Sequence, residues 1–161
     1  MSQIHTLSQA SGAVAAASGA RLRVLMIGLG SEILAIETSL VREIIDPVAL
    51  TPVPGARQFI TSLINVRGNV IPLADLSLRL ALRRSPDTVD TRFVVIEIDI
   101  DGDPVRVGIV ADKVYEVTEV AMSQSLPTPR IGAQWNPDLV RSIVKWKDEF
   151  VIVPELELLL T

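Results

Sequence analysis

The sequence predicts an all-β fold of two small five-stranded β-barrels with a few short helices. Three observations lead to this fold class. Several short segments alternate apolar and polar residues, as half-buried strands do. Glycine, asparagine and proline lie between these segments, where a chain of strands makes its turns. The second half of the chain also repeats the pattern of the first half, and short strands joined by hairpins suit closed barrels without exposed edges.

Serine, alanine, glycine and glutamine make up most of residues 1–20, and we expect this segment to be a flexible tail. The motif Gly28-Leu29-Gly30 is interpreted as a turn and not as a dinucleotide-binding loop, because the third glycine is absent. The alternating segments that follow the tail have the lengths of strands. Strands are expected at residues 21–29, 33–37, 41–45, 63–66, 70–73, 93–100, 105–110, 115–120, 140–146 and 150–153.

The centre of the chain contains the clearest hairpin, in which two β-branched apolar runs flank Arg67-Gly68-Asn69. Either the glycine or the asparagine can supply the positive φ that such a turn needs. Residues 51–55 contain two prolines, so they should form an extended connector and not a central strand. Asp75 is placed to cap a short helix over residues 76–80.

An internal repeat sets the domain organisation. The matching segments are residues 34–45 with 107–118, which lie 73 positions apart, and residues 62–76 with 142–156, which lie 80 positions apart. In the second match, both copies run through strand, polar turn, strand, acidic residue, leucine and helix. We therefore expect one folded domain over residues 21–161, whose two repeated lobes divide near residues 83–91. The order of the elements leaves open whether the two barrels exchange strands.

The composition favours a globular protein and gives little support to catalysis. Of the 161 residues, 48% are apolar and 21% are charged, which suits a packed core. There is no cysteine, so thiolate chemistry is excluded. The single histidine, His5, lies in the tail. The turn Asp101-Gly102-Asp103 lacks the ligand pattern of a calcium-binding loop. We therefore expect no enzymatic activity, no metal site and no cofactor.

A small-barrel protein that binds single-stranded nucleic acid is a less favoured alternative. Such proteins stack bases on aromatic side chains over a basic groove. This chain has a net charge of −4 and no run of lysine or arginine, and its few aromatic residues fall mostly at apolar strand positions. No apolar run approaches the length of a membrane span. A protein-interaction adaptor is the better explanation.

Residues 51–80 resemble the CheW-like domain, a chemotaxis module that couples receptors to a histidine kinase. The matching motifs are, in order, Pro52 and Pro54, Phe59-Ile60, Asn65-Val66-Arg67-Gly68, Val70-Ile71-Pro72 and Asp75-Leu76. One departure is Ser62, which stands where the family usually has glycine. The resemblance covers residues 20–160, and it implies two SH3-like barrels packed together with a receptor groove between them.

The resemblance implies a stand-alone, non-catalytic scaffold that couples methyl-accepting chemoreceptors to a CheA-type histidine kinase. The implied partners are the helical hairpin at the cytoplasmic tip of the receptor and the regulatory domain of the kinase. Nucleic acid and direct membrane insertion are not expected. We expect a cytoplasmic protein that joins membrane-anchored receptor arrays through its partners. A CheW-like coupler of a surface-sensing or type IV pilus pathway is the alternative.

The implied receptor-binding residues lie on one strand and on the central hairpin: Val41, Glu43, Ile44, Ser62, Ile64, Asn65, Arg67 and Gly68. Arg67 matches the arginine of the family motif, which implies an ion pair or several hydrogen bonds to a partner. From the residues alone, Arg67 is better explained as a solvated turn residue, and only the resemblance reverses this. Val41 and Ile44 could equally be core residues. The resemblance places kinase binding on the barrel formed mainly by the middle of the chain, without naming residues.

Overall fold

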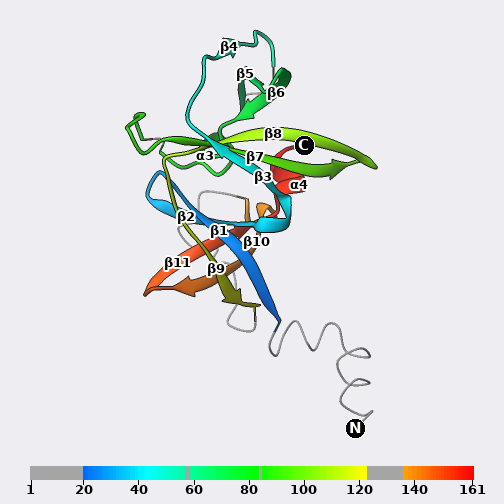
Figure 1. Cartoon of the computed structure of the whole chain (residues 1–161). Helices are drawn as coiled ribbons and strands as arrows, with labels where there is room; N and C mark the ends of the chain where they lie inside the picture. Colours follow the sequence, from blue (N-terminus) through cyan, green and yellow to red (C-terminus); the bar gives the residue numbers. More distant parts are fainter. Residues whose placement is uncertain (1–19, 57–58, 84, 123–135) are drawn as a thin grey trace.

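The structure, a computed structural model, describes residues 20–56, 59–83, 85–122 and 136–161. These residues form a five-stranded and a six-stranded β-sheet with short helices (Figure 1). The all-β class is therefore confirmed. The expected tail falls outside the described residues apart from Ala20. Within the described ranges, no helix has the length and apolar character that crossing a membrane would require.

The strands lie within a few residues of the predicted segments, and one further strand, β4, is present. This strand has two residues and lies at the edge of the six-stranded sheet, in agreement with the prediction that its proline-containing segment is no central strand. The elements are β1 (Arg21–Leu29), β2 (Glu32–Glu37), η1 (Thr38–Leu40), β3 (Val41–Ile45), β4 (Thr51–Pro52), β5 (Ile60–Val66), β6 (Asn69–Ala74), α3 (Leu76–Arg79), β7 (Arg92–Ile100), β8 (Asp103–Ala111), β9 (Lys113–Ala121), η3 (Pro137–Leu139), β10 (Val140–Trp146), β11 (Glu149–Pro154) and α4 (Leu156–Leu159).

The two repeats exchange strands. The order of the five-stranded sheet is β10-β11-β2-β1-β9, and that of the six-stranded sheet is β3-β7-β8-β6-β5-β4. Strands β1 and β2 of the first repeat thus join the last three strands of the second repeat, while β7 and β8 join strands of the first. The chain crosses between the sheets at η1 and again at Asp112. The division expected near residues 83–91 does not separate the sheets, because those residues connect α3 to β7 within the six-stranded sheet.

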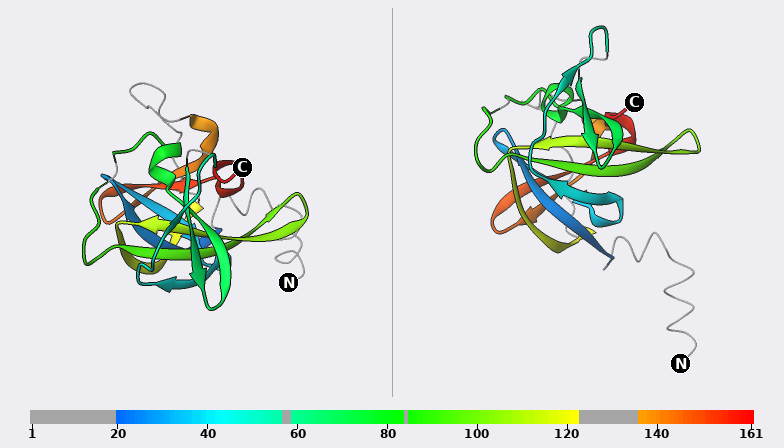
Figure 2. Two further views of the ribbon diagram at one scale, coloured as in Figure 1. Left: turned by 90° about the horizontal axis from the view of Figure 1, so that it is seen from above. Right: turned by 45° about the horizontal axis from the view of Figure 1, so that its top comes forward.

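The repeat itself is reproduced closely in the structure. The bounds of β5, β6 and α3 recur 80 positions later as those of β10, β11 and α4. The hydrogen bonds before the helices also recur, since the Asp75 amide donates to the Phe59 carbonyl and the Glu155 amide donates to the Leu139 carbonyl, each at 2.8 Å. In both views of Figure 2, the β7–β8 hairpin extends beyond the rest of its sheet.

Buried apolar side chains form three clusters, two within the sheets and one between them. One cluster lies inside the five-stranded sheet and includes Met26 and Val151. A second lies inside the six-stranded sheet, where Ile45 of β3 packs with residues of β5, β6, β7 and β8. Because β3, at one end of the strand order, shares this cluster with β5, which lies near the other end, the sheet curves around it. The largest cluster combines residues of both sheets and both α-helices, including Ile27 and Ile96, so the two sheets are held together by a common core.

Polar contacts at the short helices support this common core. The Asp75 carboxylate accepts a hydrogen bond of 3.0 Å from the Ser77 amide, which confirms the predicted cap of α3. Arg79, in the last turn of α3, donates to the carbonyls of Leu158 and Leu159 at 2.9 and 3.0 Å. These carbonyls belong to the end of α4, where backbone acceptors lack helical partners. Arg79 therefore ties the first repeat to the second.

Gly30 occupies a turn that no other residue could share without strain. Its φ is +61°, and a Cβ atom at this position would lie 2.4 Å from the carbonyl oxygen of Arg83. Its amide donates to the Asp112 carboxylate at 2.7 Å, which fixes the turn between β1 and β2 beside a chain crossing. This steric requirement explains the second glycine of Gly28-Leu29-Gly30 without a nucleotide.

Candidate partner-binding site

Strand β3 lies at one end of the six-stranded sheet and pairs with β7 alone. Its register shifts between Val41 and Glu43, so that Val41 lies opposite Ile96 while Ile44 lies opposite Val94. Ile96 and Val94 both belong to the core between the sheets, so the shift gives Val41 and Ile44 the same face. Val41 is half-buried against that core, whereas Ile44 keeps 42% of its surface exposed. The apolar face of β3 therefore runs from the core to solvent.

The hairpin between β5 and β6 turns through two residues with positive φ, Arg67 at 54° and Gly68 at 86°. The Gly68 amide donates to the Asn65 side-chain oxygen at 2.9 Å. A two-residue turn follows the twist of its strands when both central residues have positive φ. The expectation for Gly68 is confirmed, but Asn69 was the wrong alternative because it belongs to β6. Arg67, the residue before Gly68, also has a positive φ, which the sequence did not predict.

An ion pair connects this hairpin to β3. The Arg67 Nε lies 3.2 and 3.3 Å from the two carboxylate oxygens of Glu43. The Arg67 side chain is 78% exposed and that of Glu43 is 24% exposed. Among the described residues, Glu43 is the hydrogen-bond partner of Arg67, and the remaining guanidinium donors face no acceptor. The pair therefore presents an oriented cation, with further donors available, at the corner where β3 lies beside the turn between β5 and β6.

The structure brings some of the predicted residues to this corner and buries others. Glu43, Asn65, Arg67 and Gly68 gather around the hairpin turn, as the ion pair and the Asn65 contact show. Ser62 and Ile64 are only 5% and 2% exposed. They lie on the inward face of β5, on which Ile64 packs into the core of the six-stranded sheet. Their side chains are therefore core side chains in the folded protein.

Charged side chains also hold the exposed edge of β3 against its neighbours. Arg42 and Arg106 donate to opposite oxygens of Glu97 at 2.9 and 3.1 Å. The hydrogen bonds from Arg106 and then Arg42 hold the pKa of the Glu97 carboxyl below its ordinary value. Glu97 thus stays ionised, and β3, β7 and β8 are linked across their outer surface.

The second repeat carries a counterpart of the Glu43–Arg67 pair that sequence reasoning missed. Lys147 lies 80 positions after Arg67, and its Nζ is 2.8 Å from the Oε1 of Glu116, which lies 73 positions after Glu43. Tyr115 and Trp146 meet beside it edge to face, with ring centroids 6.0 Å apart. Applying the distance of 73 to Glu43 and the distance of 80 to Arg67 would have located this pair in the sequence.

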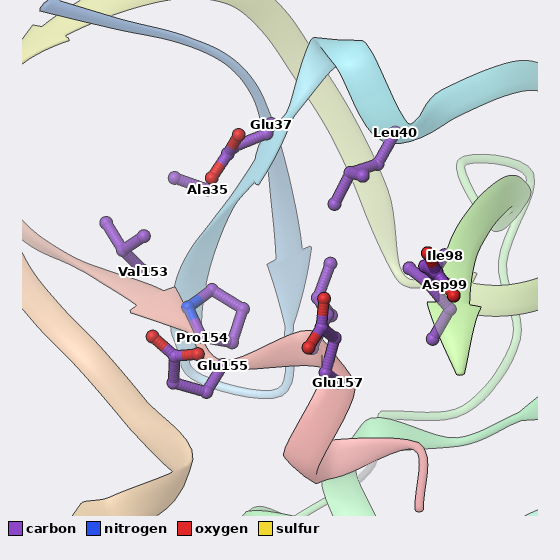
Figure 3. Close-up of a pocket in the computed structure, with 10 residues that line it drawn as sticks. Ala35, Glu37, Leu40, Ile98, Asp99, Val153, Pro154, Glu155 and Glu157 are labelled. Carbon is purple, nitrogen blue, oxygen red and sulfur yellow. The ribbon is translucent and has the colours of Figure 1, made fainter. Parts of the chain in front are cut away.

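A pocket of about 260 Å³ opens where the two sheets and α4 meet (Figure 3). Its apolar lining includes Leu40, the last residue of η1, and Leu156 of α4. Four acidic residues also line it, namely Glu37, Asp99, Glu155 and Glu157. No group of histidine, cysteine or acidic residues in the described ranges has the arrangement of a metal site. The pocket is smaller than most sites for small-molecule ligands.

Comparisons with known proteins agree with this architecture. The chain is 28% identical over 129 residues to the chemotaxis protein CheW of Rhizobium meliloti, covering 80% of this chain and 81% of that protein. It is 29% identical to the chemotaxis protein CheW of Helicobacter pylori, covering 80% and 75% of the two chains. The crystal structure of a scaffolding protein CheW from Thermoanaerobacter tengcongensis matches with a TM-score of 0.76 and 25% identity, covering 88% and 89%. The family model of the CheW-like domain matches residues 23–161, and the chain belongs to this family.

Proposed function

We propose that this chain is a scaffold of a chemotaxis signalling assembly, which couples chemoreceptors to a CheA-type histidine kinase. The observation that carries the proposal is the match of residues 23–161 to the CheW-like domain, supported by relatives named as chemotaxis proteins CheW. Scaffolds of this family are non-catalytic, so coupling rests on binding alone. Chemoreceptors and the kinase are the partners that the family implies.

The finer proposal concerns the receptor contact. We place it on the corner formed by Glu43, Asn65, Arg67 and Gly68, with Ile44 as its apolar neighbour. Support comes from the exposed guanidinium of Arg67, which Glu43 holds by one nitrogen, and from the exposed surface of Ile44. A helical hairpin can set an apolar side chain against Ile44 and an acceptor against Arg67. Ser62 and Ile64 would then act by supporting β5 from within.

Binding of both partners to the intact protein tests the proposed function. We expect a soluble fragment of a receptor hairpin and the regulatory domain of a CheA-type kinase each to bind in calorimetry, at separate sites. In a reconstituted mixture, the scaffold should make the kinase responsive to receptors. Absence of binding to both partners would overturn the proposal.

The pathway and the location are tested by two further measurements. Receptors of a chemotaxis pathway should bind more tightly than those of a surface-sensing or type IV pilus pathway. The protein should co-localise with receptor clusters at the cytoplasmic side of the membrane. It should lose this clustered distribution when the receptor gene is deleted. Stronger binding to pilus-pathway receptors would assign the scaffold to that pathway.

A further inference from the structure

Strand β3 contains a β-bulge, because it has one residue more than β7 between two pairs of opposite residues. Val41 lies opposite Ile96 and Ile44 lies opposite Val94, so three steps along β3 match two steps along β7. Val41 and Ile44 thus share one face of the strand. A bulge at the edge of a sheet can direct a side chain toward a new neighbour, and two charged residues lie within this one.

The two charged residues of the bulge, Arg42 and Glu43, are each held by a partner from another element. Arg42 donates to the Glu97 carboxylate at 2.9 Å, and Glu43 accepts from the Arg67 guanidinium at 3.2 Å. Arg106, which lies opposite Glu97 on β8, donates to the other carboxylate oxygen at 3.1 Å. A series of ion pairs therefore runs from β8 through β7 and β3 to the turn between β5 and β6.

The second repeat contains the same bulge. On β9, Val114 lies opposite Ile27 of β1, and Val117 lies opposite Leu25, so that three steps again match two. This bulge begins 73 positions after that of β3, which is one of the two repeat distances. The bulge is therefore a property of the repeated unit and not an irregularity of one strand.

The two bulges are held by contacts between the same pair of positions but with different chemistry. Counted from the paired residues beside them, Arg42 corresponds to Tyr115, and Glu97 corresponds to Gly28. The ring of Tyr115 lies against Gly28, since a Cβ atom on this glycine would be 3.3 Å from the ring carbon Cε2. An ion pair in one repeat thus takes the place of a ring packed on glycine in the other. The contact is retained although its charge is not, which indicates that holding the bulge residue is what the unit requires.

We propose that Glu97 is a positioning residue for the partner contact, which acts by holding Arg42 in the bulge. The bulge in turn directs Glu43 toward Arg67 and leaves Ile44 exposed. The inference rests on the proposed function, which places the receptor contact at this corner. The side chain of Glu97 is only 24% exposed, and both of its oxygens accept hydrogen bonds from arginines, so its effect on binding passes through β3.

The position of β3 explains why such a contact matters for affinity. This strand pairs with β7 alone, and the bulge interrupts its ladder of backbone hydrogen bonds. Without the contact from Glu97, the bulge has fewer restraints and the corner adopts several arrangements. A partner that binds one of them then has a lower apparent affinity, in proportion to the population of that arrangement.

Transfer of the contact from the second repeat to the first tests the proposal. Glu97→Gln leaves one acceptor oxygen for two arginines and should weaken receptor binding about fivefold in calorimetry. The double substitution Arg42→Tyr with Glu97→Gly installs the ring-on-glycine contact, and it should return the affinity to within about twofold of wild type. Amide hydrogen exchange of β3 should be faster in Glu97→Gln and return toward wild type in the double variant.

A matched control and a second double variant complete the experiment. Asp46→Asn breaks the ion pair of 3.3 Å with Arg92, just beyond the other end of β3, and should leave the affinity unchanged. Thermal melting checks that each variant is folded. Because glycine weakens a strand, Arg42→Tyr with Glu97→Ala is measured as well, and it should also bind more tightly than Glu97→Gln.

The outcomes separate this inference from the proposed function. If Glu97→Gln binds the receptor fragment as tightly as wild type, Glu97 is not a positioning residue, and the scaffold function stands. If both folded double variants bind as weakly as Glu97→Gln, the charges themselves contact the partner, and the positioning role is wrong. Unchanged hydrogen exchange of β3 in Glu97→Gln would also contradict it. If the unaltered protein binds no receptor, the proposed function fails and this inference fails with it.

Discussion

Two substitutions of Arg67 should separate its contribution to stability from its contribution to binding. Arg67→Ala removes the Glu43 ion pair but keeps a side chain with φ of 54°. An ion pair whose cation is 78% exposed stabilises a protein by about 0.2–1 kcal/mol. Arg67→Gly loses the same ion pair, yet it also removes a left-handed penalty of about 1–2 kcal/mol and adds about 0.5–1 kcal/mol of backbone entropy cost.

The alanine variant should therefore be less stable than wild type by up to about 1 kcal/mol, while the glycine variant should lie within about 1 kcal/mol of wild type. For a chain of this length, each kcal/mol of difference in stability between the two variants shifts the melting temperature by roughly 2–4 °C. Both variants should lose about 1–2 kcal/mol of receptor affinity in calorimetry, because both lack the guanidinium. Unchanged affinity in both variants would show that Arg67 is a solvated turn residue. A glycine variant clearly less stable than the alanine variant would refute the account of the turn.

Three substitutions and one deletion test other features. Gly30→Ala should destabilise the protein by about 2 kcal/mol or more in chemical denaturation, since its Cβ would collide with the Arg83 carbonyl at 2.4 Å; a stability close to wild type would contradict this. Val41→Asp should lower the melting temperature strongly because Val41 packs against the core, whereas Ile44→Asp should keep the fold and lose receptor binding; equal melting curves would show otherwise. Deletion of residues 1–20 should leave melting temperature and partner binding nearly unchanged, and a large loss of stability would reveal packing of that segment.

The sequence was sufficient to locate the strands, because alternation and turn residues are local signals. Strand β1 begins and ends where the alternation of residues 21–29 predicted. The repeat of 80 positions likewise predicted a helix after β11 that matches the one after β6. The capping role of Asp75 followed from its place before Leu76.

The exchange of strands and the burial of two predicted site residues could not be read from the sequence. Pairing of β1 with β9 and of β3 with β7 joins segments far apart in the chain, and no local pattern reports such partners. Ser62 and Ile64 alternate with Asn65 in a way that fixes which residues share a face, but not which face is inside. The family motif names residues of this region, but it does not distinguish buried side chains such as Ile64 from exposed ones such as Arg67.

The exchanged strands also constrain how the chain can be assembled during synthesis. The six-stranded sheet draws on residues 41–111 without interruption, so all of its strands are synthesised before β10 and β11. Strands β1 and β2 are synthesised first and pair with each other, but their other partners, β9 and β11, are synthesised after the six-stranded sheet. Until then their apolar faces lack cover, which exposes the nascent chain to aggregation and makes it a client for chaperones. A truncated product that ends near residue 112 would retain this exposed hairpin permanently.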